Sequence, residues 1–203
     1  MSDEIPGSLG SPLDGKAVLA GLGGATLQDF WRWAYSDVLV NTIRAVFGEF
    51  LVASALGVQS KPRVDWDSVD LRLESATIEV KTTSEIQAWP HPEGVTPSPP
   101  RFDIARHEKW DAETGEYSTE RGRWSDCYVF CLYKGPDHEP STNLERRMAV
   151  LDVSNWRFHV APTSELNHLG DQKTIGLKAI AARWPEWHFG DLRHQVFSAL
   201  GRS

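Results

Sequence analysis

One stretch of sequence decides the fold: Thr77-Ile78-Glu79-Val80-Lys81-Thr82. Its β-branched residues and its alternation of apolar and polar side chains predict a β-strand. Successive side chains of a strand point to opposite faces, so Glu79 and Lys81 share one face. The same acid-x-Lys spacing at residues 14–16 and 171–173 lies in polar stretches without alternation, so only this copy sits on a predicted strand.

A second strand is predicted just upstream. Residues 69–73 read Val-Asp-Leu-Arg-Leu and alternate in the same way, and Glu74 with Ser75 fits a two-residue turn between the two strands. An antiparallel hairpin with that turn pairs residue 73 with 76 and residue 71 with 78. The same register places Asp70 directly beside Glu79.

Two carboxylates on neighbouring strands repel each other unless a cation lies between them. A hard divalent ion such as Mg²⁺ would relieve the repulsion between Asp70 and Glu79, because it prefers oxygen ligands. The alternative is an exposed hairpin whose polar face carries ordinary solvated charges.

Residues 37–57 are almost continuously apolar and predict a helix that is buried on most of its faces. Glu49 is the one carboxylate in its interior. A carboxylate among small and apolar side chains is costly unless it meets a cation or a hydrogen-bond donor. Glu49 therefore needs a partner, which is either the Asp70 and Glu79 site or a salt bridge to an arginine such as Arg44 or Arg63.

In this order, a helix with Glu49, then Asp70, then Glu79 and Lys81, the chain resembles the PD-(D/E)XK nuclease superfamily. The order is similar to that of archaeal Holliday junction resolvases. The resemblance covers residues 37–89, and the remainder of the chain follows it only in the order of elements.

Two details refine the resemblance. The continuation after the lysine, with Gln87 and Trp89, is similar to a group of uncharacterised bacterial members of the superfamily. Val69 stands where many members have proline before the aspartate, which leaves Asp67 as a rival to Asp70. The hairpin register favours Asp70.

The resemblance implies a restriction-endonuclease-like core, which is an α/β fold with a central mixed β-sheet flanked by helices. It implies an endonuclease that hydrolyses phosphodiester bonds with Mg²⁺ or Mn²⁺. The implied catalytic residues are Glu49, Asp70, Glu79, Lys81 and Gln87, and the implied metal ligands are Asp70, Glu79, the main-chain carbonyl of Val80, and Glu49 for a second ion or a metal-bound water.

Lys81 would orient the attacking water and offset charge on the phosphate, a role suited to an ammonium whose pKa burial can lower. Thr82, Thr83 and Ser84 either contact phosphates or are ordinary hydroxyls at a strand end. The implied partner is nucleic acid, with DNA expected before RNA, and a homodimer is left open. A catalytically inactive nucleic-acid-binding module on the same fold and a structural or interaction protein remain alternatives.

Composition narrows these expectations. The chain has 203 residues and a net charge of −7, which argues against strong non-specific binding to a polyanion. No apolar run is long enough for a membrane span, and no basic start followed by an apolar segment suggests a signal peptide, so a cytoplasmic protein without a membrane partner is expected. Cys127 and Cys131 are expected to be core thiols.

One domain is expected over residues 26–203, after a flexible N-terminal arm over residues 1–25. A short helix, Leu27–Tyr35, should pack its aromatic side chains on the core. A long Pro-rich loop is expected near residues 90–124. The remaining expected elements are a central strand at 127–133, further strands at 148–153 and 156–160, and helices at 163–169 and 191–200.

Overall fold

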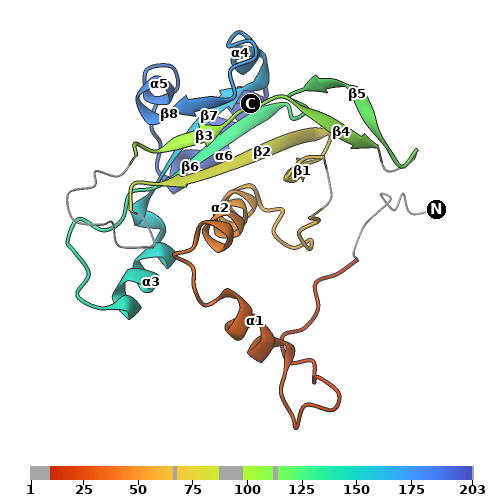
Figure 1. Ribbon diagram of the computed structural model, residues 1–203, viewed down its shortest axis with the longest axis vertical. Coiled ribbons are helices and arrows are strands. Elements are labelled where there is room, and N and C mark those ends of the chain that lie inside the picture. The colour runs from red at the N-terminus through yellow and green to blue at the C-terminus, as the bar shows by residue number, and fades with distance from the viewer. Residues whose placement is uncertain (1–9, 66–67, 87–97, 112–113, 203) are drawn as a thin grey trace.

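The computed structural model describes residues 10–65, 68–86, 98–111 and 114–202, and its centre is a four-stranded mixed sheet of order β1-β2-β6-β7 (Figure 1). Strand β1 (Leu71–Leu73) is antiparallel to β2 (Ala76–Ser84), which runs parallel to β6 (Cys127–Tyr133). Strand β7 (Trp156–Pro162) is antiparallel to β6 and forms the other edge. Helices flank the sheet, so the predicted α/β class is confirmed.

The hairpin register is confirmed. Leu73 pairs with Ala76 and Leu71 with Ile78, as the two-residue turn requires. Glu74, in that turn, has a positive φ of 55°, the left-handed conformation that tight hairpin turns use. The turn thereby fixes which residue of β2 lies opposite each residue of β1.

Strand β6 is buried along its whole length, as its apolar sequence predicts. On one face, its odd-numbered residues pack with Ile78 and Val80 against helices α2 (Asn41–Leu56) and α6 (Phe189–Ala199). Cys127 and Cys131 lie in this layer as free thiols, which confirms them as core residues.

The even-numbered residues of β6 face a second apolar layer, which includes Phe102 and Ile175. This layer is built from a small antiparallel sheet of β3 (Arg101–Asp103) and β8 (Thr174–Gly176), with α4 (Thr163–Asn167) and α5 (Leu177–Ala181). Glu79 and Lys81 lie on this side of the sheet, since they are paired in register with Tyr128 and Phe130. The helix expected at 163–169 is present as the shorter α4.

The prediction of an irregular loop over residues 90–124 is wrong for its described second half. Besides β3, the chain forms β4 (His107–Asp111) and β5 (Glu116–Gly122), which pair with each other as an antiparallel ribbon. The partner of β3 is β8, about 70 residues later in the chain. Such long-range pairing leaves no local pattern to predict it.

The strand expected at 148–153 is also wrong, because α3 (Asn143–Leu151) occupies most of it. Thr142 accepts a hydrogen bond from the Glu145 amide, and Glu145 caps the Thr142 amide in return. This capping box starts a helix whose last turn is the apolar run. A 3₁₀ turn, Val153–Asn155, then leads into β7, so the predicted edge strand after it is confirmed.

Helix α1 (Leu27–Tyr35) forms where predicted, but it does not pack on the core. None of its residues is buried and Trp33 is 83% exposed, because α2 and α6 already cover this face of the sheet (Figure 1). The described part of the expected arm folds onto α1 instead: the Gln28 amide donates to the Gly15 carbonyl and the Leu27 amide to that of Ala17. Residues 1–9 lie outside the described part of the chain.

Within the described ranges, no helix has both the length and the apolar character that crossing a bilayer requires.

The contact between α2 and β2 depends on a glycine. A Cβ added at Gly48 would lie 2.3 Å from the Thr82 hydroxyl, so the helix can approach the strand only without a side chain there. This close approach also sets the position of the next residue, Glu49.

We predict that Gly48→Ala destabilises the fold by about 1–3 kcal/mol, the usual cost of overpacking a well-filled contact. The matched control is Gly190→Ala in α6, where an added Cβ meets nothing within 4 Å. That substitution should be neutral or stabilising by up to about 1 kcal/mol, since alanine favours the helix. Urea denaturation measures both, and a Gly48→Ala protein as stable as the Gly190→Ala protein would contradict the contact.

Candidate functional site

Asp70 and Glu79 line the same open cleft, which has a volume of about 480 Å³. The segment before β1 forms one wall, and the β4–β5 ribbon forms the other. The described residues that line it are Asp65, Ser68, Val69, Asp70, Glu79, His107, Glu108, Trp110 and Tyr117. The sequence brings the acidic pair to this cleft, but it gives no indication of the wall contributed by the ribbon.

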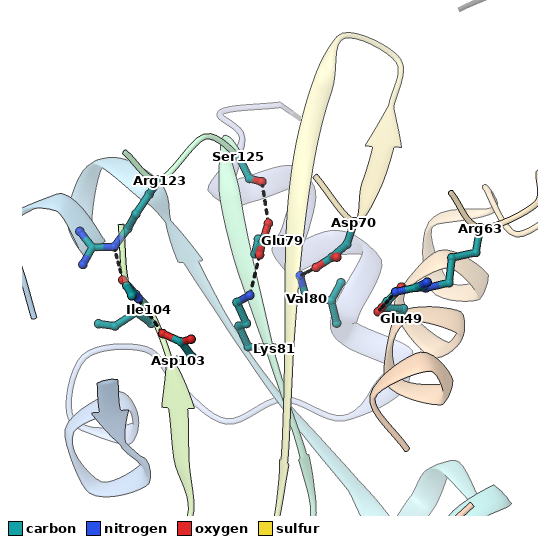
Figure 2. A network of polar contacts seen from close by, with 11 residues as sticks. Glu49, Arg63, Asp70, Glu79, Val80, Lys81, Asp103, Ile104, Arg123 and Ser125 are labelled. Carbon is teal, nitrogen blue, oxygen red and sulfur yellow. Dashed lines mark hydrogen bonds and ion pairs between the residues drawn. The ribbon is translucent and has the colours of Figure 1, made fainter. Parts of the chain in front are cut away.

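Asp70 is anchored to the backbone of β2. Its Oδ2 accepts a hydrogen bond of 2.7 Å from the Val80 amide (Figure 2). Burial and the nearby charge of Glu79 raise the pKa of Asp70 from its ordinary 3.8 to about 7, with a further contribution from Glu49. The predicted juxtaposition of Asp70 and Glu79 is therefore present, and ionising Asp70 is costly.

Glu79 is nearly buried, with 7% of its surface exposed. Its Oε1 accepts from the Lys81 ammonium at 2.6 Å, and its Oε2 accepts from the Ser125 hydroxyl at 3.3 Å (Figure 2). The acid and the amine thus form an ion pair on one face of β2, as the alternation predicts. Ser125 lies just before β6, and no sequence signal marked it as part of the site.

Lys81 differs from expectation in its pKa. Burial favours its neutral form, but Glu79, Asp70 and Asp103 outweigh burial and raise the pKa above its ordinary value. Lys81 is therefore a charged donor at neutral pH, and it cannot act as a base. The contribution of Asp103 was missed because it comes from β3, whose position depends on its pairing with β8.

Glu49 forms the salt bridge to Arg63 that the sequence allows as the alternative to a metal site. The Arg63 guanidinium binds both of its carboxylate oxygens, through Nε to Oε2 and through Nη2 to Oε1 at 3.0 Å. Arg44 instead donates to the Leu39 carbonyl at 2.7 Å. Glu49 nevertheless lies close enough to Asp70 for its charge to contribute to the raised pKa of Asp70. Its carboxylate is engaged by Arg63, so a direct metal role would require that ion pair to loosen.

The hydroxyls that follow Lys81 divide between the faces of the strand. The Thr82 hydroxyl is buried beneath α2, and the buried Ser84 hydroxyl bonds with the backbone of Ile86. Neither is available to a phosphate, so of the two alternatives both are ordinary hydroxyls of the strand. Thr83 lies on the same face as Lys81. Gln87, Trp89 and the rival Asp67 lie outside the described residues.

Arg123 holds the segments around the site in place. Its buried guanidinium donates to the carbonyls of Ile104 at 2.8 Å, Gly170 at 3.2 Å and Gln172 at 3.1 Å. These bonds connect the chain just before Ser125 to the chain just after Asp103, as Figure 2 shows for Ile104. Arg123 is therefore a positioning residue for two side chains that contact or influence Glu79 and Lys81.

As the side chains stand, no group of three or more His, Cys, Asp or Glu within the described residues is arranged to hold a metal ion. The donor set still fits a hard cation, because Asp70 and Glu79 share one cleft and both offer carboxylate oxygens. The local charge is unbalanced: the carboxylates of Glu49, Asp65, Asp70, Glu79 and Asp103 are met by the cations Lys81 and Arg63.

Comparison of the chain with protein-family models, with curated proteins and with solved structures gives no match.

We predict that Asp70→Asn stabilises the metal-free protein at alkaline pH. Because folding raises the pKa of Asp70, the unfolded chain loses this proton first, and stability falls as the pH rises from about 4 to about 7. Asparagine has no proton to lose, and its carbonyl can still accept from the Val80 amide. In EDTA at pH 8 the gain should be on the order of 4 kcal/mol, since the pKa of Asp70 rises from 3.8 to about 7 and each unit is worth about 1.4 kcal/mol.

The gain should shrink as the pH approaches 4. Asp152→Asn serves as the matched control, because bonds from Ser154 lower the pKa of this exposed carboxyl, and it should bring no gain at pH 8. Urea denaturation across the pH range measures all three proteins. Equal stability of Asp70→Asn and the parent at pH 8 would show that ionised Asp70 does not destabilise the folded protein.

Proposed function

We propose that the protein is a metal-dependent nuclease of the PD-(D/E)XK type that hydrolyses phosphodiester bonds of nucleic acid. The observation that carries the proposal is the hairpin register, which sets Asp70 beside Glu79 in one cleft with Lys81 ion-paired to Glu79. An ordinary solvated hairpin face would not bury Glu79 or raise the pKa of Asp70.

Asp70 and Glu79 would hold the divalent ion, together with the main-chain carbonyl of Val80, and Glu49 would serve a second ion or a bound water. When bound, Mg²⁺ or Mn²⁺ lowers the pKa of a water ligand and offsets charge on the phosphate that is attacked. Asp70 must be ionised to bind the cation, and the cation would in turn stabilise that ionised form.

Lys81 would orient the attacking water and contact a phosphate oxygen. A charged ammonium has three hydrogen-bond donors and no acceptor. Lys81 can therefore keep its bond to Glu79 and still direct donors toward water and phosphate. Its raised pKa favours this electrostatic role, because the ammonium stays charged while negative charge develops on the oxygens of the phosphate under attack.

DNA is the expected substrate, and two other outcomes remain open to experiment. An inactive binding module on the same fold would bind nucleic acid and leave it intact with Mg²⁺ or Mn²⁺. A structural protein would show no response to divalent ions. The Glu49 ion pair with Arg63 is the feature of the described site that most favours the inactive module, because it engages one implied ligand.

We predict that millimolar Mg²⁺ or Mn²⁺ raises the melting temperature, because an ion that binds only the folded state stabilises it by mass action. The shift should be lost in Asp70→Ala and in Glu79→Ala, and kept in Asp152→Ala, which removes an exposed carboxylate elsewhere. Scanning calorimetry and ion titration measure it. An unchanged midpoint together with no heat of ion binding would remove the metal from the proposal.

We predict that Lys81→Ala abolishes strand cleavage and leaves ion binding largely intact, since a charged lysine cannot be a metal ligand. Loss of one electrostatic contact to the transition state typically costs a factor of about 10² to 10³ in rate. Nicking of a supercoiled plasmid with Mn²⁺ measures cleavage, and calorimetry measures ion binding.

The matched control is Lys173→Ala. It removes the lysine of the acid-x-Lys string at residues 171–173, which lies at an exposed position of a loop. It should cleave like the parent. Circular dichroism confirms folding of each variant. Full activity of a folded Lys81→Ala protein would end the assignment of β2 as a nuclease strand.

A further inference from the structure

The wall of the cleft opposite Asp70 and Glu79 carries two aromatic side chains that the proposed chemistry does not use. Trp110 of β4 and Tyr117 of β5 are cross-strand partners, and their ring centroids lie 5.0 Å apart with the planes at 62°. Trp110 is 37% exposed and Tyr117 is 59% exposed. An edge-to-face pair of this kind leaves a ring face open to a third ring.

The ribbon that carries the pair is anchored at its base. The Trp124 indole donates to the His107 carbonyl at 2.8 Å, and a Cβ added at Gly122 would lie 3.0 Å from the Trp124 ring. Farther out, the Ser118 hydroxyl accepts from the Lys109 amide at 2.7 Å and donates to the Glu120 carbonyl at 2.8 Å. Figure 1 shows the ribbon extending past the four-stranded sheet beyond β1.

The charge of the cleft argues against a rigid double helix as its occupant. Its described lining contains no lysine and no arginine, while Asp65, Asp70, Glu79 and Glu108 are acidic. A duplex presents its phosphates outward and keeps its bases stacked inside. A cleft lined by carboxylates and aromatic rings therefore makes few favourable contacts with it. An unpaired base can stack on an aromatic side chain without any help from positive charge.

We propose that the Trp110 and Tyr117 pair stacks on an unpaired nucleobase next to the scissile phosphate, which makes single-stranded or locally unpaired nucleic acid the substrate class. This inference rests on the proposed function, because a divalent ion held by Asp70 and Glu79 would offset the negative charge of the lining. The aromatic wall selects the strand by its accessible bases, and the acidic pair acts on its backbone.

Binding without cleavage tests the inference. Ca²⁺ replaces Mg²⁺, and the probes are a fluorescein-labelled oligo-dT, a fully paired duplex of the same length, and an oligo-dT carrying one 2-aminopurine, whose fluorescence falls when it stacks. The parent should bind the single strand more tightly than the duplex and should quench the 2-aminopurine. EDTA should weaken the binding.

Trp110→Ala should weaken single-strand binding about ten-fold or more, as loss of one stacked base predicts, and should abolish the quenching. Trp110→Phe should retain most of both. The matched control is Trp33→Ala, which removes a more exposed tryptophan from α1, away from the cleft, and should change neither. Circular dichroism and melting temperature confirm that each variant is folded.

The outcomes separate this inference from the proposed function. Unchanged single-strand binding in folded Trp110→Ala, or equal affinity of the parent for the duplex, overturns the stacking site even if cleavage is observed. Stacking as expected, without cleavage of any probe in Mg²⁺ or Mn²⁺, keeps the aromatic site and overturns the nuclease. Failure of the parent to bind any probe overturns both.

Discussion

The repulsion between Asp70 and Glu79 is the interaction on which the rest of the site depends. A two-residue turn fixes the register that brings them together, and the Val80 amide holds Asp70 in place. Lys81 and Ser125 bind the Glu79 carboxylate, whereas Glu49, which is paired with Arg63, adds to the negative charge around Asp70. The arrangement remains net acidic, and a cation bound there would favour the ionised form of Asp70.

The surroundings of the acidic pair are built from segments that are distant in the sequence. Glu79 and Lys81 face the second apolar layer, where β3 brings Asp103 and the chain before β6 brings Ser125. Arg123 ties these two segments together through backbone carbonyls. The Arg123 guanidinium bonds with backbone carbonyls and the Asn167 side chain, so it holds these segments in place without pairing with Asp70 or Glu79.

The local features of this site could be predicted from sequence, because they depend on alternation and on one turn. The hairpin, its register, the central strand and the sharing of one face by Glu79 and Lys81 are of this kind. The pKa of Lys81 and the burial of the Thr82 hydroxyl depend on contacts between distant segments. The ribbon with Trp110 and Tyr117 pairs locally, but its strands are largely charged and polar and lack the apolar alternation that predicts a strand. The helix at Asn143–Leu151 was missed because an apolar run of a few residues fits either a strand or the last turn of a capped helix.

The central claim is that Asp70 and Glu79 together hold a divalent ion, and anomalous diffraction from a crystal soaked in Mn²⁺ tests it most directly. The account predicts an anomalous peak within coordination distance of one oxygen of each carboxylate, in the cleft between the segment before β1 and the β4–β5 ribbon. A fully occupied peak elsewhere, or no peak in the cleft while Glu79 remains paired only with Lys81 and Ser125, would contradict it.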